Sequence, residues 1–245
     1  EKDPVSAIRK NKDLSMVMAF SAVRDKLCDG VVTAGPTQGA VVAAHLVIRR
    51  LQGMKRVALC PALPHFNGKS RLLLDVGANT ELKAEHLEEL ALFASVYLEE
   101  TQGTSKPLVG LLNIGTEPGK GREVDVEVFN LLTKNPAINF YGNVEPKEIL
   151  TTECDILIND GFSGNLVMKT MEGTAKALGQ ALKEEISKTL GGKIGYLFMK
   201  KNLHNFKHRF NADDVGGAVI FGVDGIVVKA HGSSNAYAFS RAIWQ

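Results

Sequence analysis

The chain has 245 residues, of which 44% are hydrophobic and 23% charged, a balance that excludes disordered and fibrous proteins. The net charge of +2, from 29 basic and 27 acidic residues, excludes a nucleic-acid coat, and we expect no nucleic-acid partner. The cysteines, Cys28, Cys60 and Cys154, are odd in number and show no short-range pairing, which is typical of a reducing cytoplasm. No apolar run reaches the roughly 18 residues that a membrane span needs.

Hydrophobic periodicity predicts an alternation of helices and strands. The first expected helix carries Met16, Val17, Phe20, Val23 and Leu27, and it stops at Gly30. The further elements expected in chain order are a strand at 31–34, a helix at 39–50, strands at 57–60 and 72–76, a helix at 83–100, a strand at 108–112, a helix at 124–133, a strand at 138–141, a short helix at 146–150, a strand at 156–159, a helix at 165–190, strands at 218–221 and 226–229, and a helix at 235–243. Continuously apolar strands separated by helices indicate an α/β fold with a mostly parallel sheet that helices cover on both faces.

Polar turns that contain glycine follow six of the predicted strands. They lie at 35–37, 75–79, 113–117, 142–145, 160–165 and 231–234. Ligands of open α/β sheets bind beyond the carboxyl ends of the strands, so we expect the six turns to line one edge of the sheet. One such turn alone would be ordinary turn chemistry, whereas six together predict an anion-binding or acyl-transfer site.

The loop from Gly115 to Gly121 carries a lysine among glycines but lacks the spacing of a nucleotide-binding phosphate loop. That pattern needs four residues between its glycines and a Ser or Thr after the lysine, whereas here three residues separate Gly115 from Gly119 and Gly121 follows Lys120. Two interpretations of Lys120 remain: a point charge that holds phosphate, or a solvated surface lysine.

The segment from Gly161 to Asn165 places Ser163 on a strand-to-helix turn, as in the nucleophile elbow of α/β-hydrolases. That pattern ends in glycine rather than asparagine, yet His231 lies downstream and could complete a triad. The alternative needs no nucleophile, because backbone N–H groups at the start of a helix and the Asn165 amide can stabilise an oxyanion.

A basic stretch without acidic residues runs from 186 to 212. Met199, Leu203, Phe206 and Phe210 recur within it at helical spacing, so we expect a basic amphipathic helical insertion over 186–212. Such a helix is typical of a membrane surface or an acidic partner, and the alternative is a helix that packs on the domain with a solvated basic face. The residues expected at a membrane or carrier contact are Lys193, Lys200, Lys201, Leu203, Phe206 and Lys207.

Six strings of the sequence together resemble the PlsX-type phosphate acyltransferases. They are Leu-Asp-Val-Gly-Ala-Asn at 74–79, Val-Gly-Leu-Leu-Asn-Ile-Gly-Thr-Glu at 109–117, Ile-Asn-Phe-Tyr-Gly-Asn-Val-Glu at 138–145, Asp-Gly-Phe-Ser-Gly-Asn at 160–165, Lys-Thr-Met-Glu-Gly at 169–173 and Lys-Ala-His-Gly-Ser-Ser at 229–234. The likeness runs in order over nearly the whole chain.

The resemblance implies a three-layer α/β/α sandwich, similar to phosphotransacetylases and to isocitrate and isopropylmalate dehydrogenases. It implies acyl transfer from acyl carrier protein to inorganic phosphate for bacterial phospholipid synthesis. It also implies a cytoplasmic homodimer in peripheral contact with an anionic membrane. Because a thiolate is a good leaving group, we expect neither a cofactor nor a metal. By the same resemblance, Lys120 and Asn165 are the catalytic residues.

The turns supply the further residues that we expect to contact phosphate or the acyl donor. They are Gly35, Thr37, Asp75, Asn79, Asn113, Glu117, Asp160, Gly164, His231, Ser233 and Ser234.

Two departures from the family pattern keep other functions open. We expect residues 1–245 to form one α/β domain that lacks the family's N-terminal segment, and the family's Gly-Asn-Thr-Gly turn reads Gly-Pro-Thr-Gln at 35–38. The alternatives are acyl transfer from acyl-coenzyme A, and a non-catalytic module that binds the carrier protein.

Overall fold

The structure is a computed structural model that describes residues 3–64, 70–209 and 215–245, with the backbone alone at 207–209. The side chain of Lys207 and the residues Phe210 and Ala212 of the predicted insertion therefore lie outside the described residues.

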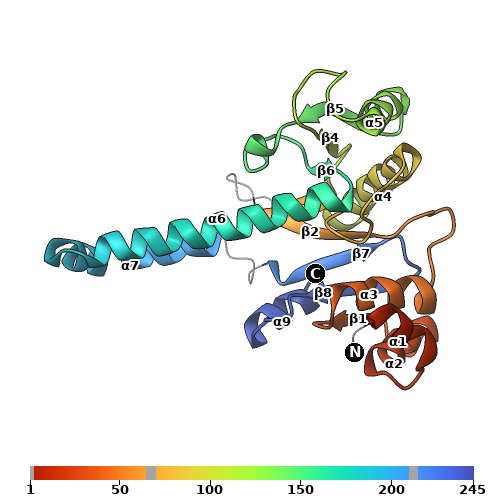
Figure 1. Ribbon diagram of the computed structural model, residues 1–245, viewed down its shortest axis with the longest axis horizontal. Helices are drawn as coiled ribbons and strands as arrows, with labels where there is room; N and C mark the ends of the chain where they lie inside the picture. Colours follow the sequence, from red (N-terminus) through yellow and green to blue (C-terminus); the bar gives the residue numbers. More distant parts are fainter. Residues whose placement is uncertain (1–2, 65–69, 210–214) are drawn as a thin grey trace.

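A mixed eight-stranded sheet forms the centre of the molecule, with the strand order β1-β8-β7-β2-β3-β6-β4-β5 (Figure 1). The strands are β1 (Gly30–Thr33), β2 (Ala58–Pro64), β3 (Ser70–Leu74), β4 (Leu108–Leu112), β5 (Asn139–Val144), β6 (Ile156–Ile158), β7 (Gly217–Phe221) and β8 (Ile226–Ala230). Four neighbouring pairs are parallel, namely β1/β8, β3/β6, β4/β6 and β4/β5, and three are antiparallel, namely β2/β3, β2/β7 and β7/β8.

Helices enclose this sheet and extend beyond it. The described helices are α1 (Pro4–Lys10), α2 (Ser15–Arg24), α3 (Thr37–Ala43), a π turn (Ala44–Ile48), α4 (Ala84–Gln102), α5 (Glu123–Lys134), a 3-10 turn (Pro146–Glu148), α6 (Gly161–Ser187), α7 (Leu190–Arg209) and α9 (Ala236–Ile243). The helix predicted at 39–50 is therefore α3 followed by the π turn, and α1 precedes the first helix that the periodicity predicts.

Successive strand residues enter different cores, which explains why the strands are continuously apolar. Leu73 of β3 packs in the core that contains Phe20 of α2, whereas its neighbours Leu72 and Leu74 pack in the core that contains Leu90 of α4. Since both faces of the sheet are covered, the chain forms the three-layer α/β/α architecture that was predicted.

The prediction that six turns share one edge of the sheet is wrong. Because β8/β7, β7/β2 and β2/β3 are antiparallel, β1 and β8 run opposite to β3, β6, β4 and β5. The turns at 35–37 and 231–234 therefore leave the sheet at the other edge from the turns at 75–79, 113–117 and 160–165. An apolar run that is buried on both faces carries no information on strand direction.

The turn predicted at 142–145 is mostly strand. β5 extends to Val144, and Asn143 pairs with Leu111 of β4. Gly142 has a φ of 121°, and the register between β4 and β5 shifts between Val109 and Gly110. The strand was predicted to end at Tyr141, which is too early, because a glycine such as Gly142 usually indicates a turn although it can also lie within a strand.

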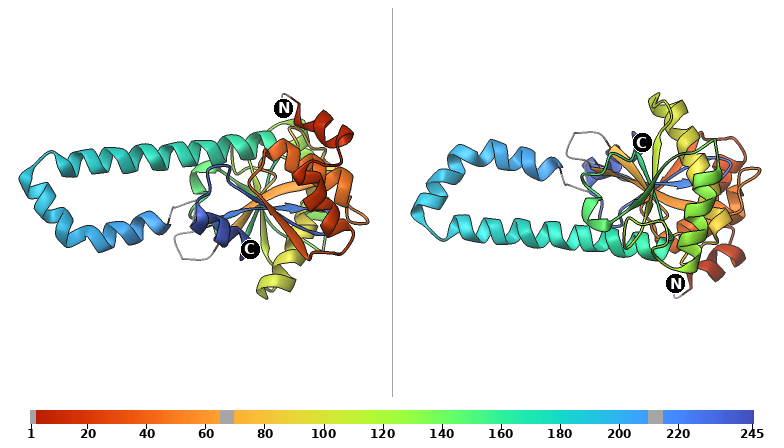
Figure 2. Two further views of the ribbon diagram at one scale, coloured as in Figure 1. Left: turned by 90° about the horizontal axis from the view of Figure 1, so that it is seen from below. Right: turned by 90° about the horizontal axis from the view of Figure 1, so that it is seen from above.

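Helices α6 and α7 form a hairpin that projects from the domain, as both views of Figure 2 show. Residues 190–209 of the basic stretch form α7, and the outer part of α6 belongs to the same projection. Leu197, Phe198 and Met199 are all exposed, and consecutive helical residues point about 100° apart, so the exposed apolar side chains of α7 extend beyond the face that carries Met199, Leu203 and Phe206. Within the described ranges, no helix combines the length and the apolar character needed to cross a bilayer.

Candidate active site

Asp75 organises the turn after β3. It is fully buried, and its Oδ1 accepts hydrogen bonds from the backbone N–H groups of Leu59 at 2.9 Å, Gly77 at 3.1 Å and Ala78 at 2.9 Å. Its Oδ2 accepts from the backbone and side-chain amides of Asn79 at 2.7 and 2.9 Å. Burial raises the pKa of Asp75, and the N–H donors oppose that rise. Because both oxygens are occupied, Asp75 acts by shaping the turn.

The start of α6 docks directly onto this turn. The N–H of Gly161 donates to the carbonyl of Asn79 at 2.9 Å, and the Asn159 amide donates to the carbonyl of Asp75 at 2.6 Å. A Cβ on Gly161 would lie 2.3 Å from the Asn79 carbonyl oxygen, and one on Gly164 would lie 2.0 Å from that of Asp75. The helix can approach the turn this closely only because both residues are glycine.

Most backbone N–H groups at the start of α6 are already bonded. Asp160 caps the helix by accepting from the Ser163 N–H at 2.8 Å, and its carbonyl accepts from the Gly164 N–H at 3.0 Å. Together with the hydrogen bond of the Gly161 N–H, these contacts leave few backbone N–H groups at the helix start to bind an anion. The side chain of Asn165 is therefore the better oxyanion donor, and it is exposed beside Gly77.

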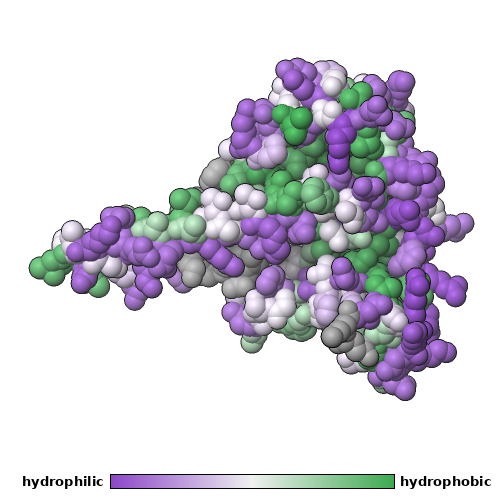
Figure 3. All heavy atoms as spheres, in the orientation of Figure 1, coloured by the Kyte–Doolittle hydropathy of each residue, from purple (hydrophilic) through white to green (hydrophobic). Residues whose placement is uncertain are grey.

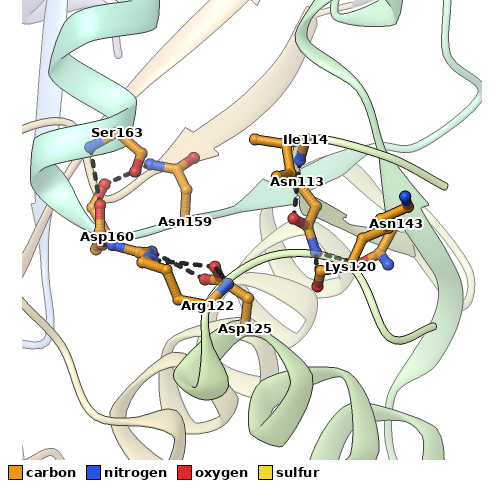
Figure 4. A network of polar contacts seen from close by, with 9 residues as sticks. All are labelled: Asn113, Ile114, Lys120, Arg122, Asp125, Asn143, Asn159, Asp160 and Ser163. Atoms are coloured by element: carbon orange, nitrogen blue, oxygen red, sulfur yellow. Dashed lines mark hydrogen bonds and ion pairs between the residues drawn. The ribbon is translucent and has the colours of Figure 1, made fainter. Parts of the chain in front are cut away.

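A pair of amides shapes the loop that carries Lys120. The Asn113 amide donates to the Lys120 carbonyl at 3.0 Å and to Oδ1 of Asn143 at 3.1 Å (Figure 4). The Asn143 amide donates in turn to the carbonyl of Glu117 at 2.8 Å. Gly121 has a φ of 95°, and a Cβ there would lie 2.6 Å from Oδ1 of Asn113. The loop is thus held by its backbone, which leaves the exposed Lys120 side chain for other contacts.

Arg122 joins the Lys120 loop to the start of α6, and the sequence analysis did not identify it. Its guanidinium pairs with buried Asp160 at 2.7 Å and with Asp125 at 2.8 Å (Figure 4). Hydrogen bonds with Asp125 first, and with Asp160, raise its pKa, so the side chain stays charged. The acidic residue three positions after Arg122, in the first turn of α5, was the available sequence signal.

The structure thus brings Lys120 and Asn165 to the ends of two neighbouring strands. Lys120 follows β4 and Asn165 follows β6, which are paired, and the Arg122–Asp160 ion pair ties the two segments together. In the part of the chain that the structure describes, no ion pair or hydrogen bond engages the amine of Lys120. Exposed Glu117 contributes its carbonyl to the loop rather than its carboxylate.

The turns after β1 and β8 form a second group. Strand β1 is parallel to β8, with Thr33 opposite Lys229, and Oγ1 of Thr33 accepts from the N–H of Gly35 at 3.1 Å. Thr37 is half-buried and opens α3. Burial, and then the charge of Lys169 of α6, lowers the pKa of Lys229.

The structure does not assemble the triad of a hydrolase. The ring of His231 lies 2.7 Å from Oγ of Ser233, and the N–H of Ser234 donates to the His231 carbonyl at 3.0 Å. No hydrogen bond links His231 to Ser163 among the residues with described side chains. In the same described part, no three His, Cys, Asp or Glu side chains gather as metal ligands would.

Comparison with known proteins gives one family. Residues 1–245 match the family described as "Fatty acid synthesis protein". The phosphate acyltransferase of Acholeplasma laidlawii is 55% identical over 239 residues, covering 97% of this chain and 72% of the relative. The phosphate acyltransferase of Macrococcus caseolyticus is 45% identical over 245 residues, covering 100% of this chain and 75% of the relative.

Among solved structures, a phosphotransacetylase from Streptococcus pyogenes matches with a TM-score of 0.58 and 16% identity, covering 99% of this chain and 73% of that one. A branched-chain phosphotransacylase from Enterococcus faecalis matches with a TM-score of 0.57 and 17% identity, covering 92% and 76%. These similarities show the same α/β fold.

Replacement of Gly164 by alanine tests the docking of α6. The added Cβ would lie 2.0 Å from the Asp75 carbonyl oxygen, so we expect the free energy of unfolding to fall by about 1–3 kcal/mol, the usual cost of an overpacked site. Gly173→Ala on the same helix is the matched control, because a Cβ there meets nothing within 4 Å and should stabilise by up to about 1 kcal/mol. Urea denaturation measures both variants, and equal stability of the two would contradict the close approach.

Proposed function

The chain belongs to the fatty acid synthesis protein family, in which its relatives are phosphate acyltransferases, and we propose that it transfers a fatty acyl group from acyl carrier protein to inorganic phosphate. The product is acyl phosphate for phospholipid synthesis. The observation that carries the proposal is the placement of a cation, Lys120, and a side-chain amide, Asn165, after adjacent strands, neither of them with a side-chain partner among the residues that the structure describes.

The chemistry of the proposed reaction suits these two groups. A phosphate oxygen attacks the thioester carbonyl, a tetrahedral oxyanion forms, and the C–S bond breaks as the carbonyl returns. The acyl group leaves on phosphate, and the thiolate of the carrier's prosthetic group takes up a proton from solvent. Lys120 attracts phosphate and the developing charge, and the Asn165 amide donates to the oxyanion.

Positioning is the main task of the protein in this scheme. Phosphate is already anionic near neutral pH, so it needs no strong base, and a thiolate is a good leaving group. The amides of Asn113 and Asn143 hold the Lys120 loop, and the Asp75 turn holds the first turn of α6, so the backbone that carries each group is in place before the reaction begins.

An assay with matched thioesters tests the proposal against its alternatives. Palmitoyl-(acyl carrier protein) and palmitoyl-coenzyme A are each incubated with the chain and phosphate, and acyl phosphate is trapped with hydroxylamine. Faster release from the carrier thioester supports the proposal, and faster release from coenzyme A favours the phosphotransacetylase-like alternative. Tight carrier binding without release from either thioester would show a non-catalytic binding module.

We expect Lys120→Ala and Asn165→Asp each to lower turnover by about 10²–10³-fold, the usual loss when one preorganised electrostatic group is removed. A carboxylate at position 165 would repel both phosphate and the oxyanion. Ser163→Ala should have a mild effect, and Lys134→Ala on exposed α5 surface serves as a control lysine. Unchanged turnover of Lys120→Ala at saturating phosphate would remove Lys120 from the mechanism, and an acyl-serine at Ser163 would support a hydrolase instead.

The helical hairpin is the surface that we propose for membrane and carrier contact. Apolar side chains are exposed along its outer part (Figure 3), with Leu190 76%, Leu197 71% and Phe198 84% exposed. Lys193, Lys200 and Lys201 are exposed on α7 and would attract an anionic lipid or the acidic carrier. Of the other predicted contact residues, Phe206 is exposed and Leu203 is half-buried.

Binding of the chain to vesicles of anionic phosphatidylglycerol tests the membrane contact. We expect binding that weakens with salt, since each lysine near the surface contributes about 1 kcal/mol and this attraction is screened. Leu197→Glu with Phe198→Glu should abolish it, whereas Met18→Glu with Leu27→Glu, at exposed positions on and just after α2, should not. Sedimentation with vesicles measures all three proteins, and equal binding by both double variants would exclude the hairpin.

We also propose that a second copy of the chain covers part of α6. Leu178 is 66% and Leu182 45% exposed, and their spacing of four residues places them on one stripe of the helix. Multi-angle light scattering should give twice the mass of 26.5 kDa, and Leu178→Glu with Leu182→Glu should halve it while leaving the circular dichroism spectrum unchanged. A monomeric parent chain at micromolar concentration would contradict the homodimer.

A further inference from the structure

Lys229 is a buried lysine that the proposed mechanism does not use. It lies in β8 with 8% of its surface exposed, and its amine donates to the carbonyl of its own neighbour, Ala230. No carboxylate pairs with it within residues 3–64, 70–206 and 215–245. The charge that acts on it is another cation, Lys169 of α6, which itself pairs with Glu172 at 2.9 Å.

Strand geometry places this amine on the face of the sheet that α6 covers. Val227, two residues earlier, packs in the core against which Met168 and Met171 of α6 lie, and side chains two apart in a strand share a face. Thr33 of β1 is opposite Lys229 in the parallel pair, and Val31 lies in the same core. The amine therefore lies near the carboxyl ends of β1 and β8, on the same side of the sheet as α6.

A buried ammonium without a counterion is unfavourable, and a second lysine beside it adds repulsion. Burial, and then the charge of Lys169, accordingly lowers the pKa of Lys229. The turn after β8 adds an unsatisfied group, since Oγ of Ser234 is buried with no hydrogen-bond partner among the described residues. Each ammonium has three N–H groups, so both keep donors beyond those bonded to the Ala230 carbonyl and to Glu172. An oxyanion ligand would accept hydrogen bonds from these remaining donors and would supply the missing counter-charge.

We propose that Lys229 and Lys169 hold the inorganic phosphate that attacks the thioester, an inference that rests on the proposed function. Lys169 follows Asn165 by four residues on α6, so the two side chains are neighbours on one face, about 6 Å apart along the axis. Phosphate held there lies within reach of a carbonyl whose oxygen is bonded to Asn165. Lys120 then acts on the same reaction from the loop after β4.

The phosphodiester of the carrier's prosthetic group has the same chemistry but fits the position less well. The extended arm places that phosphodiester much further from the sulfur than one helical turn. A site beside Asn165 is therefore suited to free phosphate, and the experiment compares the two sources directly.

The test uses the whole chain and the variants Lys229→Met, Lys169→Met and Lys176→Met. Methionine matches the length of lysine and is apolar, so a buried methionine at 229 keeps the packing of β8, while Lys169 is exposed enough to be replaced without loss of the fold. Lys176, exposed on the same helix, is the matched control. Calorimetry measures the binding of inorganic phosphate, and steady-state assays measure KM for phosphate and for the carrier thioester.

We expect the Kd and the KM for phosphate to rise about 10- to 100-fold in Lys229→Met and in Lys169→Met, the scale for loss of one charge-assisted hydrogen bond. The KM for the thioester and the behaviour of Lys176→Met should not change. Unchanged phosphate affinity in Lys229→Met, or a rise confined to the KM for the thioester, would overturn the proposal. If Lys229→Met does not fold, Lys169→Met decides by the same criteria.

Calorimetry keeps this inference separate from the proposed function. If the parent chain releases no acyl phosphate from any thioester yet binds phosphate, and Lys229→Met does not, the phosphate site stands and the proposed reaction fails. If the parent chain transfers acyl groups but Lys229→Met binds phosphate as well as the parent does, the reaction stands and the site fails.

Discussion

The contact between the Asp75 turn and the start of α6 is the constraint on which the site depends. One buried carboxylate accepts five N–H groups, from β2 and from its own turn, and so fixes where the helix can begin. Gly161 and Gly164 then allow the helix to meet the turn backbone against backbone. This contact sets the position of Asn165, because Asn165 directly follows Gly164 in the same helical turn.

The two segments that carry Lys120 and Asn165 are also coupled to each other, through Asp160 at the start of α6. Asp160 caps α6 and also pairs with Arg122, which in turn holds Asp125 at the start of α5. The loop that carries Lys120 ends where Arg122 begins. A single buried carboxylate thus aligns two helix starts and, through them, the cation and the amide.

The sequence predicted most of the secondary structure but not the directions of the strands. Residues such as Leu72–Leu74 read as one apolar run because alternate side chains enter different cores, and that pattern is the same whichever way the strand runs. For this reason the turns at 35–37 and 231–234 were expected beside the others. In the site, glycine and asparagine positions such as Gly164 and Asn113 were apparent from the turn patterns. Arg122 and Lys229 were missed because their importance lies in a partner distant in sequence, Asp160 for one and Lys169 for the other.

The unbroken course of α6 has a mechanical consequence. One helix of 27 residues, about 40 Å long, holds Asn165 in its first turns and reaches the far end of the hairpin with its last. The helix is anchored at the Asp75 turn, so a force on its outer end changes the tilt of the helix axis at its first turns. Gly173 and Gly179 lie between the two ends with open space around them, and they are the points at which such a rod bends most easily.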